Sequence, residues 1–403
     1  MPVFVEVALP VPLRQNFSYR VKDELQTTLQ IGLRVKVPFG RQQLVGLITA
    51  ISDTCNLAPQ QIKSVTAVLD DAPLLPDSLY KLTIWAARYY FTSQGQMLSQ
   101  ALPVALRKGL DATPQTLVEY HLTEQGRQAD ASVLKRAPAQ KKLFELLLSQ
   151  PLTQDEFTTQ ALSKSALNAL QEKQWVEQKN RPVSHNVSWR QQLVMNESPH
   201  KLNKQQAVAV SVLTQQQGFH CTLLEGITGS GKTEVYLTLL ETILKQGKQA
   251  LILVPEIGLT PQTINRFKRR FAVTVAVIHS GLTDNQRLEA WRQARVGEPA
   301  IIIGTRSALF TPMAFPGLII LDEEHDSSFK QQEGVRYHAR DLAVMRGHLE
   351  DIQVVLGSAT PSLETLQNAL SGRYHHLELS ERAGVAQKVK QGIIDITSQP
   401  LKA

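Results

Sequence analysis

Residues 226–233 read GITGSGKT, and this stretch decides the fold that we expect for the second half of the chain. It matches the pattern G-x-x-x-x-G-K-[ST], in which glycines let backbone N–H groups wrap around phosphates. The apolar run HCTLLE (220–225) precedes it, and the amphipathic run TEVYLTLLETILKQ (233–246) follows it. A strand, a glycine-rich loop and a helix in this order predict a nucleotide-binding site at the helix amino-terminus.

The same alternation of apolar strands and amphipathic stretches continues on the carboxyl side of this loop. Buried strands that alternate with helices indicate a parallel α/β sheet with right-handed crossovers. The further expected strands are QALILV (249–254), VTVAVI (273–278), AIIIG (300–304), LIILD (318–322) and QVVLG (353–357).

A cluster of acidic residues follows one of these strands and supplies a second part of the site. Asp322 and Glu323 come directly after LIIL, and ligands of parallel sheets bind at the carboxyl ends of the strands. We expect Lys232 to reach the β- and γ-phosphates, and Thr233 and Asp322 to hold Mg²⁺. Glu323 is then the candidate that orients and deprotonates the attacking water. The alternative is a solvated acidic turn.

Composition restricts the class of protein. The chain has 403 residues, 42% of them hydrophobic and 20% charged, which excludes a disordered or fibrous chain and favours two or three domains. Its two cysteines cannot form a disulfide framework or a four-ligand zinc site. The longest apolar runs are far shorter than a membrane span, so we expect a cytoplasmic protein without a membrane segment. The net charge of +7 only weakly favours nucleic acid as a partner.

The expected fold class is multidomain α/β. Residues 1–108 contain short β-rich runs separated by Pro, Gly and polar turns, which predict a small sheet or barrel. Residues 109–180 contain three short helical runs and the strand-like WVEQ, a winged-helix arrangement, with a plain helical domain as the alternative. We expect a linker at 181–200, the nucleotide-binding lobe at 201–380 and a connecting segment at 381–403.

Further motifs appear in a fixed order around the phosphate loop and DEEH (322–325). They are LNKQQ (202–206), PEIGLTPQ (255–262), GTRSALF (304–310) and GSATP (357–361). This order resembles the motifs of superfamily 2 helicases, and the chain is similar over its whole length to the bacterial primosomal replication-restart helicases, the PriA family. The resemblance implies a β-rich 3′-DNA-binding domain, a winged-helix domain and one RecA-like lobe.

For the ATP site, the resemblance implies that Gln206 reads adenine and that the GSATP segment couples hydrolysis to movement along DNA. The expected ligands of ATP and Mg²⁺ are Gly226, Thr228, Gly229, Ser230, Gly231, Lys232, Thr233, Gln206 and Asp322. The expected coupling residues are His325, Ser358 and Thr360.

For DNA, the resemblance implies two groups of contacts. The pocket for a 3′ end maps to Phe17, Tyr19, Gly40 and Lys63, and the strand contacts map to Thr260, Thr305, Arg306, Phe329, Lys330, Arg336 and Tyr337. Ser18 stands where relatives often carry Asp, and Val335 where they often carry an aromatic residue. The alternatives are that Phe17 and Tyr19 are ordinary strand residues, that Arg306 is a surface charge, and that the loop aromatics pack on the lobe.

The family function implied is an ATP-dependent 3′-to-5′ DNA helicase that recognises abandoned or stalled forks and assembles the primosome. Its expected partners are branched and single-stranded DNA, primosome proteins and single-stranded DNA-binding protein, and the chain is expected to be a monomer. The second lobe with its arginine finger, and the zinc-binding cysteines, are expected outside this chain, so we expect weak nucleotide binding and very slow hydrolysis. The alternatives are a fork-binding module with an incomplete ATP site, or another superfamily 2 translocase.

Overall fold

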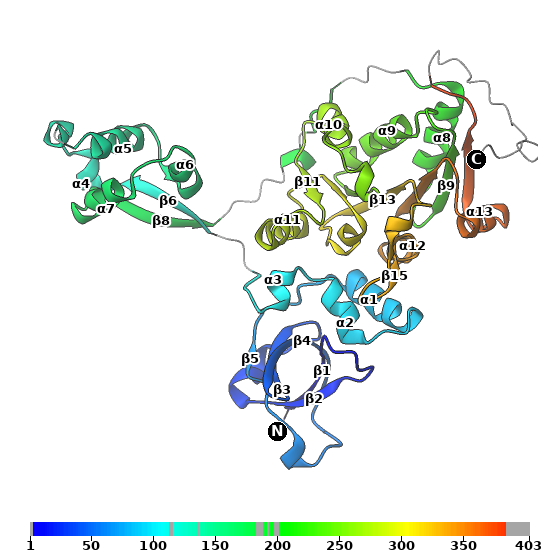
Figure 1. Cartoon of the computed structure of the whole chain (residues 1–403), viewed down its shortest axis with the longest axis horizontal. Coiled ribbons are helices and arrows are strands. Elements are labelled where there is room, and N and C mark those ends of the chain that lie inside the picture. Colours follow the sequence, from blue (N-terminus) through cyan, green and yellow to red (C-terminus); the bar gives the residue numbers. More distant parts are fainter. Residues whose placement is uncertain are drawn as a thin grey trace, which may run out of the picture. The chain divides into compact units, whose positions relative to one another are not determined.

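The computed structural model describes residues 3–112, 116–135, 137–182, 188–191, 193–196 and 201–383. The chain divides into two compact units (Figure 1), one formed by residues 1–111 and 187–403 and the other by Ala112–Asn186. The second unit begins and ends within a few residues of the winged-helix segment expected at 109–180. Each unit is described by itself below.

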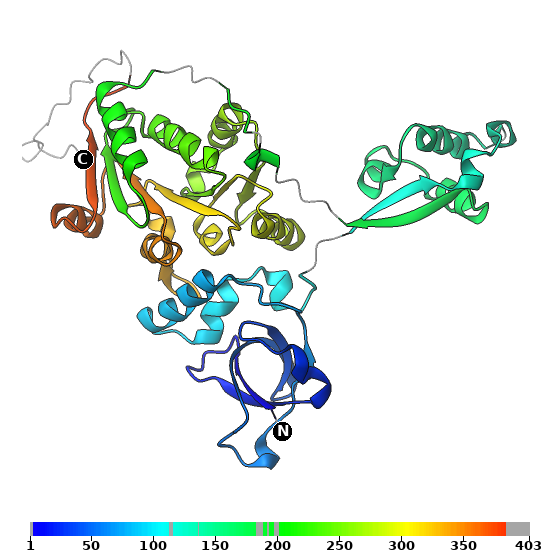
Figure 2. The ribbon, with the colours of Figure 1, turned by 180° about the vertical axis from the view of Figure 1, so that it is seen from behind.

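The first unit starts with a five-stranded antiparallel sheet of order β2-β1-β4-β3-β5. Its strands are β1 (Val3–Ala8), β2 (Phe17–Val21), β3 (Arg34–Phe39), β4 (Gln42–Ser52) and β5 (Ala67–Val68). The chain after β4 returns to β2, where Arg20 N donates to Lys63 O at 2.9 Å and Val65 N donates to Arg20 O at 2.9 Å. These bonds satisfy the outer edge of β2, and the sheet curls into the small barrel seen in Figures 1 and 2.

Three helices follow the barrel: α1 (Asp77–Tyr89), α2 (Gln94–Gln100) and α3 (Val104–Arg107). The buried side chain of Arg34 connects the last of these helices, α3, to the sheet. Arg34 of β3 donates from Nη2 to Asp70 Oδ1 at 2.7 Å, and from Nη1 to Leu106 O in α3. A buried guanidinium is tolerated only when its donors have partners, and here both carboxylate and carbonyl oxygens accept.

The second unit is a three-stranded antiparallel sheet with helices, in the order β7-β6-β8. Its elements are β6 (Thr116–Leu122), α4 (Glu124–Arg127), α5 (Pro138–Ser149), β7 (Leu152–Thr153), α6 (Gln154–Thr159), α7 (Lys164–Glu172) and β8 (Val176–Pro182). Ser163 accepts a bond from Ala166 N and caps α7, as its position before the helical run predicts. Strand β6 was not predicted from the sequence, although it forms the centre of this sheet.

The lobe of the first unit contains a seven-stranded parallel sheet of order β11-β12-β10-β13-β16-β9-β17. Its strands are β9 (Cys221–Gly226), β10 (Gln249–Leu253), β11 (Val275–Ile278), β12 (Ile301–Gly304), β13 (Pro316–Asp322), β16 (Gln353–Ser358) and β17 (His375–Leu379). Six of the seven were expected; β17, which reads HHLEL, was not, because its exposed edge position leaves little apolar pattern.

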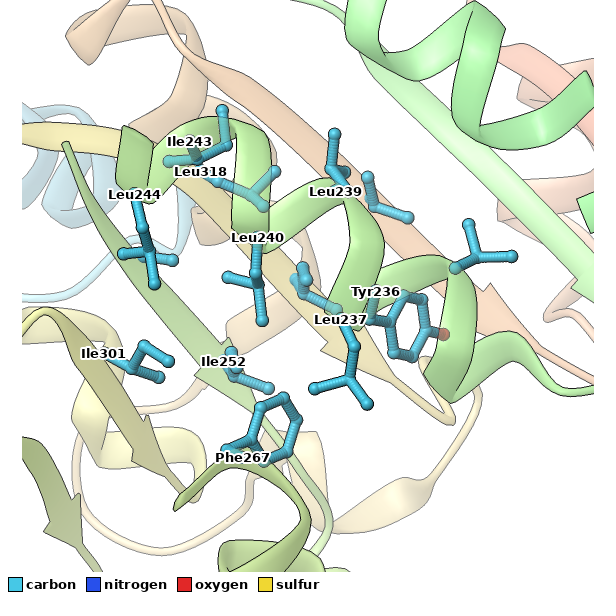
Figure 3. Close-up of a cluster of buried hydrophobic side chains, with 14 of the residues drawn as sticks. Tyr236, Leu237, Leu239, Leu240, Ile243, Leu244, Ile252, Phe267, Ile301 and Leu318 are labelled. Carbon is cyan, nitrogen blue, oxygen red and sulfur yellow. The ribbon is translucent and has the colours of Figure 1, made fainter. Parts of the chain in front are cut away.

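The helices of the lobe are α8 (Lys204–Gln215), α9 (Lys232–Lys245), α10 (Pro261–Arg270), α11 (Asp284–Val296), α12 (Ala339–Glu350) and α13 (Leu363–Leu370). They cover both faces of the sheet (Figures 1 and 2). Side chains alternate along each strand, so one face of the sheet contributes Ile252, Ile301 and Leu318 to a core with α9. Figure 3 shows Leu240 and Leu244 of α9 among them.

The stretch expected as a linker packs on the lobe where the structure describes it. Trp189 is buried, and its indole N–H donates to Gly297 O at 3.0 Å. The Arg190 guanidinium stacks on the Phe315 ring and donates to Gly247 O. Most of the connecting segment expected at 381–403 lies outside the described residues. Among the described residues, no helix is both long enough and apolar enough to cross a bilayer.

We predict that Leu240→Ala lowers the free energy of unfolding by about 2–5 kcal/mol, because this side chain is fully buried and the substitution leaves a cavity. Urea denaturation followed by circular dichroism measures the change. The matched control is Val208→Ala on α8, where the side chain is 60% exposed and a change below about 0.5 kcal/mol is expected. Equal losses for the two variants would contradict the assigned core.

Candidate functional site

The phosphate loop has the backbone conformation that its glycines predict. Gly229 and Gly231 have φ angles of +82° and +81°, in the left-handed region that favours glycine. Lys232 is the first residue of α9, and its Nζ donates to Gly226 O at 2.9 Å. The buried Ser230 Oγ has no hydrogen-bond partner among the described residues. The loop therefore holds its lysine in place and presents an unsatisfied donor.

The acidic cluster lies at the same edge of the sheet as the phosphate loop. Strands β13, β16 and β9 are neighbours and run parallel, so their carboxyl ends lie together. Asp322 is the last residue of β13. Its pKa is raised mainly by burial and secondly by the negative charge of Glu323. The Glu323 Oε1 atom lies 3.7 Å from Lys232 Nζ. Glu323 has φ +49°, a conformation that costs a non-glycine residue about 1–3 kcal/mol and is common at functional sites.

One cavity of about 1180 Å³ brings these groups together. The predicted residues that line it are Gln206, Thr228, Gly229, Ser230, Gly231, Lys232, Thr233, Asp322 and Glu323. Gly226 lies beside it as the acceptor of the Lys232 bond. A hydroxyl and a carboxylate are the hard oxygen ligands that Mg²⁺ prefers, so the donor set fits a magnesium–nucleotide complex. The sequence analysis missed Arg266 and Arg269 of α10, which also line the cavity.

Both ends of the Gln206 amide, which is expected to contact adenine, are held by hydrogen bonds within the protein. Its Nε2 donates to Ser230 O at 2.9 Å, and its Oε1 accepts from Asn203 N at 2.9 Å. The second bond belongs to a capping box at the start of α8. The side chain is 3% exposed. In this structure the amide supports the phosphate loop, and its contact with adenine remains a prediction.

The expected coupling residues lie next to one another. His325 Nδ1 and Ser358 Oγ are 2.7 Å apart, and Thr360 N donates to the same hydroxyl at 3.0 Å. The acidic cluster and the GSATP segment are thus joined by direct hydrogen bonds. Their role in movement along DNA remains a prediction.

Glu324 is the residue of this region that the sequence analysis gave no role. It is fully buried, and its carboxylate accepts from Ser362 N at 2.7 Å and Thr365 Oγ1 at 2.9 Å. Arg340 Nη1 lies 3.3 Å from the same group. These bonds connect DEEH to the start of α13 and to α12. Nothing in the sequence marks the pairing, because the partners are up to 41 residues away.

The strand-contact candidates on the lobe fall into two places. Thr260 is exposed and caps α10 by accepting from Thr263 N. Thr305 and Arg306 line a separate pocket of about 270 Å³. Arg306 donates to Ser328 O at 2.7 Å and to Lys330 O at 3.1 Å. Its guanidinium therefore holds the loop after DEEH, so it is more than a plain surface charge.

The aromatic residues of that loop are buried. Phe329 is 0% and Tyr337 3% exposed, and the Tyr337 ring packs edge-on against Phe310 at 5.4 Å. Lys330 and Arg336 remain exposed. In this structure both rings therefore pack on the lobe, as the alternative interpretation has it, and they are not exposed for stacking on bases. Lys330 belongs to β14 (Lys330–Gln331) and Tyr337 to β15 (Tyr337–His338), which pair as a short antiparallel hairpin.

The candidate 3′-end residues occupy one side of the barrel. Phe17 is partly buried, edge-on to Phe39 at 5.1 Å, and Gly40 follows Phe39 in an open turn. Tyr19 is 4% exposed and donates to Pro38 O at 3.2 Å, so its ring belongs to the core. Lys63 is exposed beside β2.

Ser18, between Phe17 and Tyr19, donates to the Glu6 carboxylate. A carboxylate is therefore present beside this position even though residue 18 is not acidic. The role of the whole pocket remains a prediction.

Three family models match successive parts of the chain. They describe a 3′DNA-binding domain at residues 6–103, the winged helix of primosomal protein N′-like proteins at 116–178, and a DEAD/DEAH box helicase at 203–369. The replication restart protein PriA of Haemophilus influenzae is 45% identical over 99% of this chain and 54% of its own length. The chain belongs to the PriA family. The PriA proteins of Bacillus subtilis and Chlamydia pneumoniae are 30% and 36% identical over 98% and 100% of the chain.

The chain spans about half the length of the curated relatives it matches, with 58% of the Bacillus subtilis protein and 54% of the Chlamydia pneumoniae protein covered. The family models also confirm the expected fold class. The chain is a multidomain α/β protein with a 3′DNA-binding domain, a winged-helix domain and one helicase lobe, whose parallel sheet fits a RecA-like lobe.

We predict that Glu324→Ala lowers the free energy of unfolding by about 3–5 kcal/mol, because it breaks a buried ion pair with Arg340 and removes the buried acceptor of Ser362 N and Thr365 Oγ1. Chemical denaturation measures the loss. The matched control is Glu364→Ala, which removes a carboxylate 3.8 Å from the same guanidinium but 73% exposed. That change is expected to cost about 0–1 kcal/mol. A cost for Glu324→Ala as small as the control would refute its role as a buried connector.

Proposed function

We propose that the chain is the nucleotide- and DNA-binding part of an ATP-dependent 3′-to-5′ DNA helicase that recognises abandoned or stalled replication forks and restarts replication by assembling the primosome. The observation that carries this proposal is the cavity in which the phosphate loop meets Asp322 and Glu323, in a chain that also matches a 3′DNA-binding domain. The relatives named above, replication restart proteins, support the same assignment.

The residues of the cavity have different roles in phosphoryl transfer. Lys232 neutralises charge on the β- and γ-phosphates, and the loop N–H groups at the start of α9 hold the phosphate oxygens. Thr233 and Asp322 would hold Mg²⁺, which neutralises charge on the transferred group when bound. Glu323 orients water and takes its proton. His325 and Ser358 transmit the state of this site to the GSATP segment through their hydrogen bond.

The DNA contacts belong to the same proposal. The barrel would receive a 3′ end near Phe17, Gly40 and Lys63. The lobe would contact one strand at the exposed Thr260 and at the pocket that Thr305 lines. Primosome proteins, single-stranded DNA-binding protein, a monomeric state and a cytoplasmic location follow from the family resemblance. We propose that this chain by itself hydrolyses ATP very slowly, since the resemblance places the arginine finger in a second lobe.

We predict that Lys232→Ala weakens the binding of a fluorescent N-methylanthraniloyl-ADP by at least about tenfold, because charge-assisted hydrogen bonds contribute about 1.5–3 kcal/mol. Fluorescence titration in the presence of Mg²⁺ measures the affinity. The matched control is Lys245→Ala, an exposed cation at the other end of α9 that pairs with Glu241. Unchanged affinity in the Lys232 variant would rule out a nucleotide site at this loop.

We further predict that the chain binds model forks with a free 3′-hydroxyl on the leading strand at least about fivefold more tightly than forks with a 3′-phosphate. A pocket that accepts the hydroxyl leaves no room or partner for a terminal phosphate, and an unsatisfied polar group costs about 1–3 kcal/mol. Fluorescence anisotropy at one fixed salt concentration measures both affinities, since backbone contacts depend strongly on salt. Equal affinities would reduce the assignment to a superfamily 2 motor on a general DNA-binding platform.

A further inference from the structure

Tyr236 stands out among the residues of the lobe core because its hydroxyl points out of that core. It lies on α9 one turn after Lys232, is 2% exposed and sits among leucines of the same helix. Its hydroxyl donates to Asp322 Oδ1 at 3.0 Å. In Figure 3 the hydroxyl oxygen of Tyr236 lies on the side of the ring that faces away from Leu237 and Leu240. The hydroxyl thus joins the phosphate-loop helix to the carboxylate at the end of β13.

The neighbouring strand leaves a space for this hydroxyl. Gly357 of β16 pairs with Asp322 across the sheet, and a Cβ atom built on Gly357 would lie 1.6 Å from the Tyr236 hydroxyl oxygen. No side chain fits at such a distance, so any other residue at 357 would displace the tyrosine. The first glycine of GSATP therefore permits the tyrosine–aspartate bond, a requirement that the motif alone does not reveal.

The hydroxyl acts as a donor toward the carboxylate. A phenol O–H is a donor and an ionised carboxylate can only accept, so the bond runs from Tyr236 to Asp322. One oxygen of the carboxylate is thus engaged by a fixed donor, while Asp322 still lines the nucleotide cavity.

We propose that Tyr236 is a positioning residue for magnesium–nucleotide binding: its hydroxyl fixes the orientation of the Asp322 carboxylate toward the Mg²⁺ that accompanies the nucleotide. This inference rests on the proposed nucleotide site. Partners that orient a metal-binding carboxylate contribute about 10–100-fold to metal affinity. A tyrosine that served only to fill the core would not affect the dependence of nucleotide binding on Mg²⁺.

The variant Tyr236→Phe removes only the hydroxyl and keeps the ring in the core. Binding of N-methylanthraniloyl-ADP is measured first in EDTA and then along a Mg²⁺ titration, with the whole 403-residue chain. We expect unchanged affinity in EDTA, where the phosphate loop binds without metal. The Mg²⁺ concentration that gives half of the full increase in affinity is expected to rise at least about tenfold.

Two further variants make the result specific. Tyr374→Phe removes a hydroxyl from the turn between α13 and β17 of the same lobe and is expected to leave the Mg²⁺ dependence unchanged. Asp322→Asn is expected to raise the half-effective Mg²⁺ concentration, and adding Tyr236→Phe to it should produce no further rise. Non-additivity of this kind indicates that the two side chains act through one interaction.

Each other outcome overturns the proposal. An unchanged Mg²⁺ dependence in Tyr236→Phe would leave the hydroxyl without a role at the metal. An equal loss of affinity in EDTA and in Mg²⁺, or loss of a cooperative thermal transition, would identify a purely structural role. If Asp322→Asn itself left the Mg²⁺ dependence unchanged, the magnesium role in the proposed function would fail. If Lys232→Ala also bound nucleotide normally, the whole site would be misassigned.

Discussion

Strand β16 lies between β9 and β13, and because all three run parallel, their carboxyl ends meet at one edge of the sheet. The phosphate loop follows β9, the acidic cluster follows β13, and GSATP follows β16. This arrangement places Lys232 and Glu323 in one cavity, and it brings Ser358 within hydrogen-bond distance of His325. Antiparallel pairing of β13 would have moved its acidic end to the opposite edge, away from the nucleotide cavity.

The same edge contains two buried carboxylates, those of Asp322 and Glu324, and both accept hydrogen bonds. Unpaired, a buried carboxylate or guanidinium would destabilise the lobe strongly. Glu324 therefore accepts from Ser362, Thr365 and Arg340, and Asp322 accepts from Tyr236. A connected set of this kind has few alternative geometries, because a shift of one member leaves another unsatisfied. The site is held by hydrogen bonds that reach from α9, α12 and α13.

Much of this could be predicted from the sequence because the deciding signals are local. The glycines of 226–233, the apolar strands and the acidic cluster each lie within a few residues, and the structure places them as a parallel sheet requires. The features that the sequence did not predict depend on partners far away along the chain. The burial of Tyr337 depends on Phe310, and the hydrogen bonds of Glu324 depend on α12 and α13. Strand β6 was not predicted because, among the described residues, it pairs only with strands that follow it by thirty residues or more.

The double attachment of Gln206 changes how variants at this position are to be interpreted. One end of its amide caps α8 and the other holds the carbonyl of Ser230, so the side chain belongs to the scaffold of the phosphate loop. Substitution at 206 alters the loop whether or not a base is present. A fall in ATP affinity would then extend equally to GTP, CTP and inorganic triphosphate, and discrimination among bases has to be measured as a ratio of affinities within one variant.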